Sequence, residues 1–406
     1  MILKRLIVFA FLVCLILGCK KHKDIVSEDE VIRINPNQAR EVVNLSEIVD
    51  SVKYIKLETG PGYLMGRILR IIIKEKYIYA LDLSRQSIYV FDKEGKYVSV
   101  LDKQGKGPDE YLRLGPIIID NNEEFIKIYT SSGEGNVFLK YSNISFNLIE
   151  KISMPRVYAN SVRNEGDLYY FATQQIENIV DGKSTNADIL VVNNGEIAKC
   201  LFNKTITTRG SGFSPNVESF TKNNEGKLFV SIMYNNTFYE LDKMNANPFI
   251  TIDFGRDGID NSIGNEPLDK QLEYLKSITG LAAFPVLNIN NADIMAFSYY
   301  FAEDNNSKLF QKNPGLHQYL IFKKSNKTIH TKSIKNDITG FPEEIYFTTY
   351  YHNIAHEAWY KNYLVDIVNP ASYLSKKNKT QKYVEGLGEI SINDNPIIIL
   401  IKLKEL

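Results

Sequence analysis

A short phrase, in which a polar turn precedes an apolar or aromatic strand, recurs along this chain and limits its possible folds more than any other feature. Five copies have Tyr79, Tyr129, Tyr169, Phe229 and Met295 at equivalent positions, so the spacings are 50, 40, 60 and 66 residues. Repeats of this size are typical of solenoids and propellers. The uneven spacing excludes a strict 40-residue repeat and favours repeats with insertions.

The turns before these strands are rich in asparagine and glycine. They include Asn121-Asn122, Asn164-Glu165-Gly166, Asn224-Glu225-Gly226 and Asn290-Asn291. Such residues are typical of tight turns between strands. Their positions set the phase of the repeat.

The clearest copy contains four strand-like runs, Ile71–Ile73, Tyr77–Leu81, Ile88–Phe91 and Tyr97–Leu101. Gly95 lies in the last turn, where a positive φ is accessible to glycine without steric cost. Four short antiparallel strands joined by tight turns form one propeller blade. The third run recurs at residues 137–141, 189–192, 238–241 and 319–322.

The predicted fold is therefore all-β, a six-bladed β-propeller of four-stranded antiparallel blades that occupies residues 31–406 as a single domain. Five blades are visible in the repeats, and the stretch from Phe341 to the end must supply the sixth. Since an open ring would expose a strand edge, we expect the two chain ends to meet in one blade. The candidate strands are Val31–Ile34, which alternates in part, and the continuous apolar run Ile397–Ile401.

Two segments break the strand pattern. Residues 267–278 place Leu268, Leu272 and Leu275 among charged residues, as an amphipathic helix would. Residues 370–387 also have a helical, though uneven, apolar face. We expect both to be short insertions on the rim of the propeller.

The first 30 residues do not belong to this domain. Lys4 and Arg5 precede the apolar stretch Leu6–Leu17, which is too short for a bilayer span and typical of a signal peptide. Ile16-Leu17-Gly18-Cys19 resembles the lipobox of bacterial lipoprotein precursors. This resemblance implies a signal peptide of residues 1–18, a lipidated Cys19 and a charged tether over residues 19–30; the alternative is a signal peptide with a chance cysteine.

These features predict a location in the bacterial cell envelope, with the protein attached to a membrane through its N-terminal lipid. The outer membrane is the expected membrane, and its periplasmic or surface side stays open. Lys20-Lys21-His22-Lys23 follow the cysteine, whereas some surface-exported lipoproteins carry acidic residues there.

The charge balance says what the protein is not expected to bind. Lys and Arg total 48 and Asp and Glu total 48, and no basic stripe is visible, so we expect no nucleic-acid partner. Cys200 is the one cysteine left after Cys14 and Cys19, and no disulfide is available. We expect a monomer without a cofactor.

Several segments resemble a family of six-bladed propeller lipoproteins from Gram-negative anaerobes. The resemblance is strongest in Gly105-Lys106-Gly107-Pro108-Asp109-Glu110-Tyr111, and it extends to residues 52–58, 78–96, 236–241 and 395–400. It implies the propeller fold over nearly the whole mature chain. It implies no catalytic residues, because propellers serve both binding and catalysis.

The motif that carries Gly105, Gly107, Pro108, Glu110 and Tyr111 is glycine-rich, which raises the possibility of a phosphate-binding loop. A P-loop requires a Lys-Ser/Thr pair at the start of a helix, and the motif has neither the pair nor a following helical pattern. We interpret the motif as a junction between the outer strand of one blade and the next blade, in which Glu110 bonds to backbone.

Three arginines in such junctions are the main candidates for ligand binding: Arg113, Arg209 and Arg256. Links from outer strands to the next inner strands gather around one mouth of a propeller channel. Guanidinium groups there could bind a carboxylate or phosphate in a bidentate way. Alternatively, each pairs with a nearby carboxylate, such as Asp109 or Asp257.

Two further candidates concern aromatic and histidine pairs. Tyr350-Tyr351 and Tyr299-Tyr300 could stack on a sugar ring, or they could simply pack in the core or at the rim. His352 and His356 are four residues apart, as in a helical metal site. However, Asn353 occupies the position where a zinc protease has glutamate, and we predict no metal.

The first functional hypothesis is a non-enzymatic binding module that presents a loop-lined mouth to a small-molecule, glycan or protein ligand. The alternatives are an envelope hydrolase or lyase acting on a glycan or lactone at the same mouth, and a scaffold in an envelope complex. An enzyme requires an acid–base pair or metal ligands in the channel, whereas a scaffold requires an exposed apolar patch.

Overall fold

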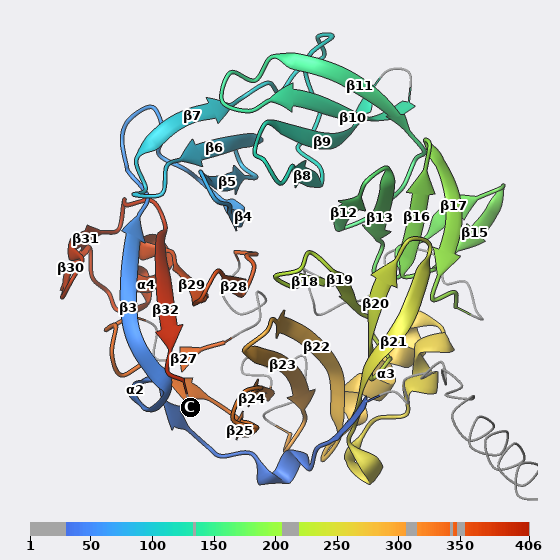
Figure 1. Cartoon of the computed structure of the whole chain (residues 1–406), viewed down its shortest axis with the longest axis vertical. Coiled ribbons are helices and arrows are strands. Elements are labelled where there is room, and N and C mark those ends of the chain that lie inside the picture. The colour runs from blue at the N-terminus through green and yellow to red at the C-terminus, as the bar shows by residue number, and fades with distance from the viewer. Residues whose placement is uncertain are drawn as a thin grey trace, which may run out of the picture.

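The computed structural model describes residues 30–132, 135–204, 219–305, 315–341, 344–346 and 354–405. These residues form a β-propeller, in which four-stranded antiparallel sheets stand side by side in a ring (Figure 1). In the first three sheets and the fifth, the chain passes from the innermost to the outermost strand. The all-β class and the blade architecture predicted from the repeats are confirmed.

The first three sheets each contain four strands, which follow one another from the innermost outward. The first sheet contains β4 (Ile68–Ile73), β5 (Ile78–Asp82), β6 (Ser87–Phe91) and β7 (Tyr97–Leu101). The second contains β8 (Ile117–Ile119), β9 (Phe125–Ser132), β10 (Gly135–Ser142) and β11 (Leu148–Met154). The third contains β12 (Ser161–Glu165), β13 (Leu168–Ala172), β16 (Ile189–Asn193) and β17 (Glu196–Leu201).

The remaining large sheets have the same arrangement. The fourth contains β18 (Phe220–Lys222), β19 (Leu228–Ser231), β20 (Thr237–Asp242) and β21 (Asn245–Asp253). The fifth contains β22 (Ala282–Asn290), β23 (Ile294–Phe301), β24 (Leu316–Phe322) and β25 (Lys327–Thr331). The last contains β28 (Trp359–Tyr360), β29 (Tyr363–Val368), β32 (Ile397–Leu403) and β3 (Val49–Lys56).

The predicted phase of the repeat is confirmed by the strand pairing. All five equivalent residues, from Tyr79 to Met295, lie in second strands, and the third-strand phrases lie in β6, β10, β16, β20 and β24. Gly95 has a φ of +84°, as its turn requires, and a Cβ there would stand 2.4 Å from the Lys56 carbonyl oxygen.

The predicted number of six blades is wrong. The described residues form seven sheets of three or more strands. The additional sheet has three strands of two residues each, β2 (Val43–Asn44), β26 (Ile334–Lys335) and β27 (Glu344–Ile345). Strands this short carry no period in the sequence, so the repeat could not reveal them.

The two chain ends meet in one sheet, but through a different N-terminal strand from the one predicted. β3 pairs antiparallel with β32, where Lys53 lies opposite Leu400 and Ile55 opposite Ile398. Ile397–Ile401 is therefore a closing strand, and its partner is β3. The assignment of Val31–Ile34 to this sheet was wrong.

That first segment lies elsewhere on the ring. β1 (Glu30–Arg33) pairs in parallel with the outer strand β21, so it adds a fifth strand to the fourth sheet. A strand of alternating character suits such an outer edge as well as it suits a closing sheet, which is why the pattern alone misplaced it.

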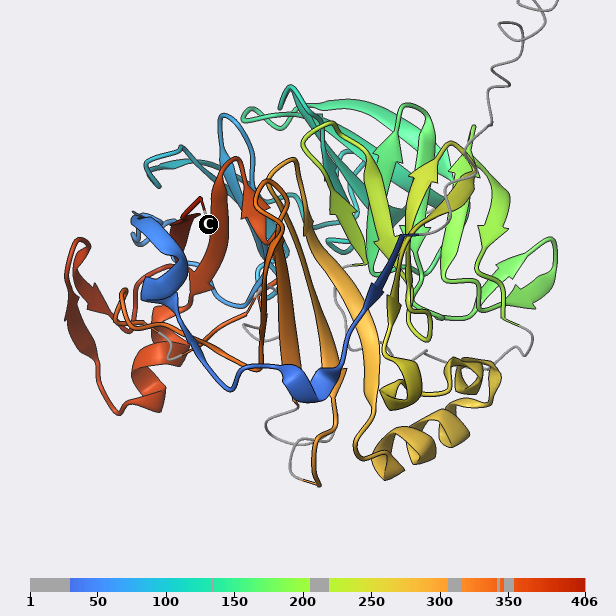
Figure 2. The same ribbon diagram turned by 60° about the horizontal axis from the view of Figure 1, so that its bottom comes forward.

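Between β1 and β3 the chain forms a strap across the outer edge of the fifth sheet, visible in blue after the dark-blue β1 in Figure 2. The strap contains η1 (Pro36–Gln38), β2 and α2 (Leu45–Ile48). The Arg40 N–H donates to the His330 carbonyl at 2.9 Å, and the Lys332 N–H donates to the Arg40 carbonyl at 2.8 Å. The strap thereby covers an edge that would otherwise be open for aggregation.

The core is divided among the contacts between neighbouring sheets. Tyr79 and Leu81 of the first sheet pack with Ile126 and Ile128 of the second, and Ile71 and Ile78 pack with Ile398 of the last. Similar apolar clusters join the second sheet to the third, the third to the fourth, the fourth to the fifth and the fifth to the last. This burial, which carries most of the folding free energy, holds the inner strands at a fixed distance from the ring centre.

The insertions agree in part with prediction. α3 (Leu268–Ser277) follows two short 3₁₀ turns, η2 (Gly255–Asp257) and η3 (Asn261–Asn265), and confirms the first expected helix. The second expected helix ends early: α4 spans Pro370–Lys376, and the hairpin β30 (Gln381–Val384) and β31 (Gly388–Ser391) follows. Asn378, with a φ of +53°, leaves the helical conformation just after α4, and Gly386, with a φ of +76°, lies in the hairpin turn.

One further hairpin, β14 (Asn178–Val180) and β15 (Lys183–Thr185), projects from the third sheet. No helix among the described residues is long and apolar enough to cross a membrane.

Candidate functional site

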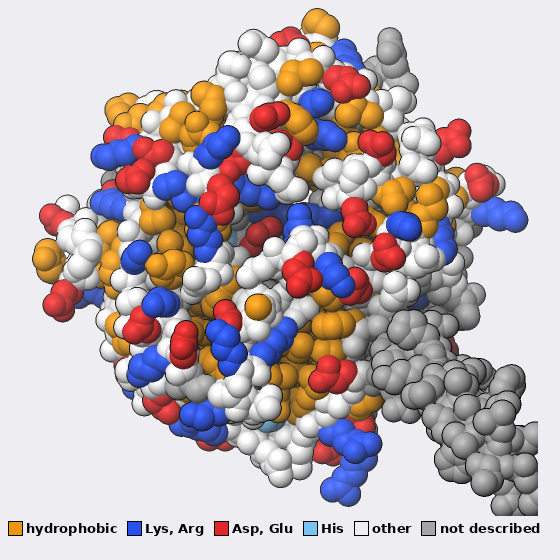
Figure 3. Space-filling model, in the orientation of Figure 1, with side chains coloured by type: hydrophobic (Ala, Val, Ile, Leu, Met, Phe, Trp, Pro, Cys, Tyr) orange, Lys and Arg blue, Asp and Glu red, His pale blue; other side chains and the backbone are white. Residues whose placement is uncertain are grey.

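The turns between first and second strands surround the mouth of a central cavity. Two adjoining cavities, of about 560 and 510 Å³, share Lys74, Asn121, Arg163, Lys222 and Glu357 among their lining residues. Volumes of this size are typical of small-molecule sites. In Figure 3, Lys and Arg side chains gather around a hollow at the centre of the ring, with acidic side chains among them.

Each of the six large sheets contributes a polar turn or strand end to this mouth. Lys74 follows β4, Asn121 follows β8, Arg163 lies in β12 and Lys222 ends β18. The turn after β22 adds Asn290 and Asn291, and the turn after β28 adds Lys361 and Asn362. Since inner strands converge on the ring axis, residues far apart in the sequence line the same cavity.

Glu357 reaches the cavity through an additional pairing at the inner edge of the first sheet. Ala355 bridges in parallel to Arg70 of β4: the Ile71 N–H donates to the Ala355 carbonyl, and the Ala355 N–H donates to the Leu69 carbonyl, both at 2.9 Å. The segment thus lies inside the ring of first strands, and it brings Glu357 to the cavity wall.

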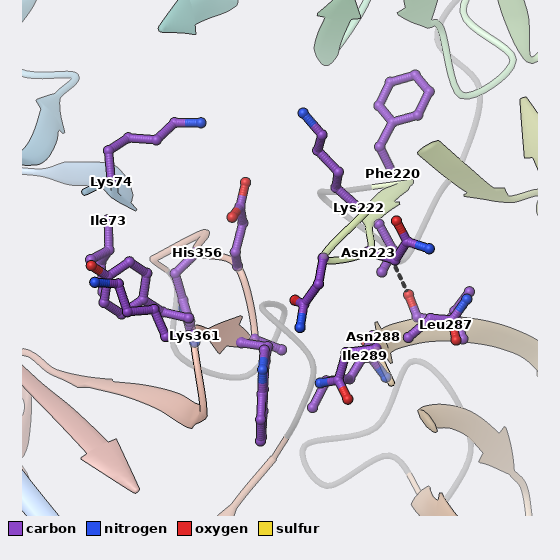
Figure 4. Close-up of a pocket in the computed structure, with 18 of the residues that line it drawn as sticks. Ile73, Lys74, Phe220, Lys222, Asn223, Leu287, Asn288, Ile289, His356 and Lys361 are labelled. Carbon is purple, nitrogen blue, oxygen red and sulfur yellow. Dashed lines mark hydrogen bonds between the residues drawn. The ribbon is translucent and has the colours of Figure 1, made fainter. Parts of the chain in front are cut away.

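The lysines of the mouth point into the opening. Figure 4 shows Lys74 and Lys222 extending into it from opposite sides. Within the described residues, neither ammonium group makes a hydrogen bond or an ion pair. Lys361, by contrast, pairs with Glu75 at 2.8 Å.

The surroundings of Lys222 are electrostatically unfavourable for its charge. Desolvation by the surrounding channel wall lowers the pKa of Lys222, and the cations of Lys74 and Arg163 lower it further. Glu357 and Glu165 act in the opposite direction. The lowered pKa therefore reflects mainly the burial of Lys222, to which the two neighbouring cations add.

Amide and aromatic groups complete the larger cavity. Its asparagines are Asn121, Asn223, Asn224, Asn288, Asn290, Asn291 and Asn362, and its aromatic residues are Phe220, Trp359 and Tyr360. The Asn291 Nδ2 and Trp359 Nε1 donors are buried and have no acceptor within the described residues. The guanidinium of Arg163 lies 5.8 Å from the Phe220 ring centre, within cation–π range.

The arginines predicted to bind a ligand lie elsewhere. Arg113 and Arg256 follow the outer strands β7 and β21, in links between sheets, and neither lines the two cavities. The Arg256 side chain is 96% exposed and lies 3.7 Å from Asp257, in line with the alternative that it pairs with a carboxylate. Arg209 lies outside the described residues.

The tyrosine candidates do not line the cavities within the described part of the chain. Tyr350 and Tyr351 lie outside the described residues, as does His352. Tyr299 and Tyr300 are buried in the fifth sheet. Their aromatic surface belongs to the core, whereas the aromatic residues at the mouth, Phe220, Trp359 and Tyr360, stand out in no sequence motif.

The glycine motif has the geometry of a junction between sheets. The Glu110 carboxylate accepts the Gly107 N–H at 2.7 Å, and a Cβ on Gly105 would stand 1.8 Å from Glu110 Oε2. Tyr111 is fully buried and donates its hydroxyl hydrogen to the Gln86 carbonyl at 2.6 Å. Pro108 lies in the turn between Gly107 and Glu110.

His356 lines both cavities but presents its ring to the backbone. Its Nδ1 lies 3.0 Å from the Ile354 carbonyl and its Nε2 lies 3.2 Å from the Val365 carbonyl. Over the described ranges, no group of three His, Cys, Asp or Glu side chains could hold a metal ion.

A signal for this mouth is present in the sequence. The Asn-rich turns that set the phase of the repeat are the same turns that line it, at Asn121, Asn164, Asn224 and Asn290. Equivalent turns of successive blades meet at one end of a propeller. These turns therefore indicate the site as well as the fold.

Comparisons with known proteins support the fold and show the family. A protein from Bacteroides fragilis, described as exported, is similar over 92% of this chain and 99% of its own, with 16% identity and a TM-score of 0.61. A member of the DUF4221 family from Bacteroides vulgatus is similar over 88% and 97%, with 10% identity and a TM-score of 0.50. At these identities the likeness concerns the fold alone.

No curated protein matches the chain. One family model matches residues 29–402, which include nearly every strand described above in full. The chain therefore belongs to the family described as Domain of unknown function (DUF4934).

Proposed function

We propose that this protein is a lipid-anchored binding module of the cell envelope that takes a small polar ligand into the mouth of its central channel. The observation that carries the proposal is the pair of lysines, Lys74 and Lys222, that extend into a cavity of about 560 Å³ without a partner among the described residues. A site lined by converging polar groups on rigid strands is suited to binding, because few side chains must be ordered when the ligand enters.

The envelope location rests on the N-terminal sequence. Residues 1–18 have the form of a signal peptide, and Cys19 lies where a lipoprotein carries its lipid. The similar protein from B. fragilis is described as exported. Only ten residues separate Cys19 from Glu30, so the tether would attach near the outer edge of β21.

Lipidation can be tested with the full-length precursor and its Cys19→Ser variant in a Gram-negative host. We expect an alkyne-labelled fatty acid to be incorporated into the wild type and not into the variant. Equal labelling of both proteins would exclude Cys19 as the lipid site. Fractionation of inner and outer membranes would then locate the labelled protein.

Binding can be tested without knowledge of the ligand. A panel of small envelope metabolites would be screened by thermal unfolding of the wild type, of Asn224→Trp and of Asn247→Trp. Asn224 lines the larger cavity, whereas Asn247 is exposed in the outer strand β21. We expect a compound that stabilises the wild type and the Asn247 variant but not the Asn224 variant; equal stabilisation of all three would place binding outside the mouth.

One observation supports the alternative of an envelope hydrolase or lyase. Glu357 and Lys222, whose pKa is lowered, line both cavities together. A carboxylate and a lysine of lowered pKa are suitable for general acid–base chemistry. This alternative predicts turnover of a glycoside or lactone that is lost in Glu357→Gln, whereas a binding module predicts binding without turnover.

A further inference from the structure

We infer that the ligand of this mouth is an acidic saccharide, a hydroxylated ring that carries a carboxylate; the inference rests on the proposed binding function. It follows from three kinds of side chain that line the same cavity: cations in excess of carboxylates, amides and flat apolar surfaces. Each kind recognises a different part of such a ligand.

The charge of the cavity favours one negative group. In the larger cavity Lys361 is paired with Glu75, whereas Lys74 and Lys222 make no ion pair among the described residues. The carboxylates near Lys222 are Glu357 and, in the adjoining cavity, Glu165. Lys74 and Arg163 disfavour the positive charge of Lys222, in addition to desolvation, which is the larger cause of its lowered pKa. A ligand carboxylate would relieve this repulsion, because an opposite charge stabilises the protonated lysine.

The amides favour hydroxyl groups around that charge. Asn223 uses its Oδ1 to accept the Lys227 N–H at 2.8 Å, and Asn290 uses its Oδ1 to accept the Lys323 ammonium at 2.9 Å. The Nδ2 groups of both make no hydrogen bond within the described residues. These donors match hydroxyl oxygens, and the Glu357 carboxylate can accept from a hydroxyl.

An aromatic residue supplies a surface for the ring itself. Trp359 lines the cavity from the last sheet and is partly exposed, whereas Phe220 packs in the core between the third and fourth sheets. The Trp359 Nε1 is buried without an acceptor among the described residues, so the part of the side chain open to the cavity is its apolar surface. Simple inorganic anions make no use of an apolar face, and the aromatic surface therefore favours a sugar acid over free phosphate.

Isothermal titration calorimetry on the purified protein tests the inference with galacturonate, digalacturonate, galactose and inorganic phosphate as probes. We expect digalacturonate or galacturonate to bind and galactose to bind at least ~10-fold more weakly, the loss that follows from removing a charge-assisted hydrogen bond. Phosphate binding as tight as that of both uronates would overturn the saccharide assignment. Galactose binding as tight as galacturonate would overturn the role of the cations.

The matched variants are Lys222→Gln, Lys74→Gln and Lys183→Gln. Lys183 is exposed on β15 and lines neither cavity, so its variant removes the same charge away from the mouth. We expect uronate affinity to fall about 10- to 100-fold in the first two, the range for a hydrogen bond to a charged group, and to stay unchanged in the third. Thermal midpoints equal to wild type would show that the variants fold.

The outcomes separate this inference from the proposed function. If none of the four probes binds while the metabolite screen gives a compound blocked by Asn224→Trp, the saccharide class is wrong and the mouth remains a binding site. If uronates bind equally to the wild type, Lys222→Gln and Lys74→Gln, the location of the anion site is wrong.

Discussion

The fifth sheet contains a buried cluster of ionisable groups that should make the protein sensitive to acid. The Tyr299 hydroxyl lies 2.7 Å from His330 Nε2 and 3.1 Å from His317 Nδ1. His317 is 1% exposed. A hydroxyl has one hydrogen to donate, so one neutral imidazole accepts it while the other can donate its N–H to the oxygen.

Protonation of these histidines is unfavourable in the folded protein. Burial lowers the pKa of His317 to about 3, and the neighbouring His330 and Lys332 add to this effect. Burial also lowers the pKa of His330 to about 4. Because both folded pKa values lie below the unfolded value of about 6.5, the unfolded chain binds more protons at intermediate pH. Stability is therefore complete above about pH 6.5 and is lost as the pH falls towards 4 and 3.

The size of the effect follows from the two shifts. At pH 5 each unfolded histidine is protonated and each folded one is neutral, which corresponds to about 2 kcal/mol per histidine relative to neutral pH. The pair therefore costs about 4 kcal/mol, since one pKa unit corresponds to about 1.4 kcal/mol. This is a large share of the stability of an ordinary domain.

Urea unfolding at about pH 7.5 and about pH 5 measures this loss. We compare the wild type with a His317→Gln/His330→Gln double variant, because carboxylates contribute equally to both and cancel in the difference. We expect the wild type to lose about 4 kcal/mol more than the variant between the two pH values. Equal losses in both proteins would refute the assignment of neutral, buried histidines.

Three further predictions concern the junction, the closing sheet and the charge of the mouth. Tyr111→Phe should lower the free energy of unfolding by about 1–2 kcal/mol, since the partly buried Gln86 carbonyl loses its donor; an unchanged urea midpoint would contradict this role. In a Cys200→Ser background, Ser51→Cys/Lys402→Cys should form a disulfide under mild oxidation because these residues are opposite each other in β3 and β32. The Val31→Cys/Lys402→Cys pair should not form one. Mass spectrometry of non-reduced peptides identifies the linked pair, and a disulfide in the second variant but not in the first would contradict the pairing of β3 with β32. As the pH rises, uronate binding should begin to weaken before an ordinary lysine would lose its proton, because the pKa of Lys222 is lowered. Calorimetry from about pH 7 to about pH 10 measures this, and a constant affinity over that range would argue against Lys222 as the anion's partner.

The repeats in the sequence were sufficient for the blade architecture because each blade buries its own second and third strands. Tyr79 and Tyr129 are 0% and 6% exposed, and their apolar phrases are periodic for that reason. The closing strand was harder to assign. Val31–Ile34 and β3 both alternate in part, and the choice between them depends on pairing with β32, which no local pattern encodes.

The arginine candidates and the cavities lie at different places on the ring for a related reason. Arg113 and Arg256 attract attention as single residues, but they lie in links that follow outer strands, and Arg256 faces solvent. Lys74 and Lys222 lie in turns that look ordinary one at a time. They matter because the fold brings them to the same cavity. Glu357, which lies beside β4, joins them there, and no sequence pattern indicated it.

A bromide soak of protein crystals tests the central claim most directly, since bromide reports where the protein holds an anion whatever the natural ligand is. We predict an anomalous peak in the mouth between Lys74 and Lys222, and its loss in crystals of Lys222→Gln. Peaks beside Arg113 or Arg256 with none in the mouth would contradict the account and move the binding site to the links between sheets.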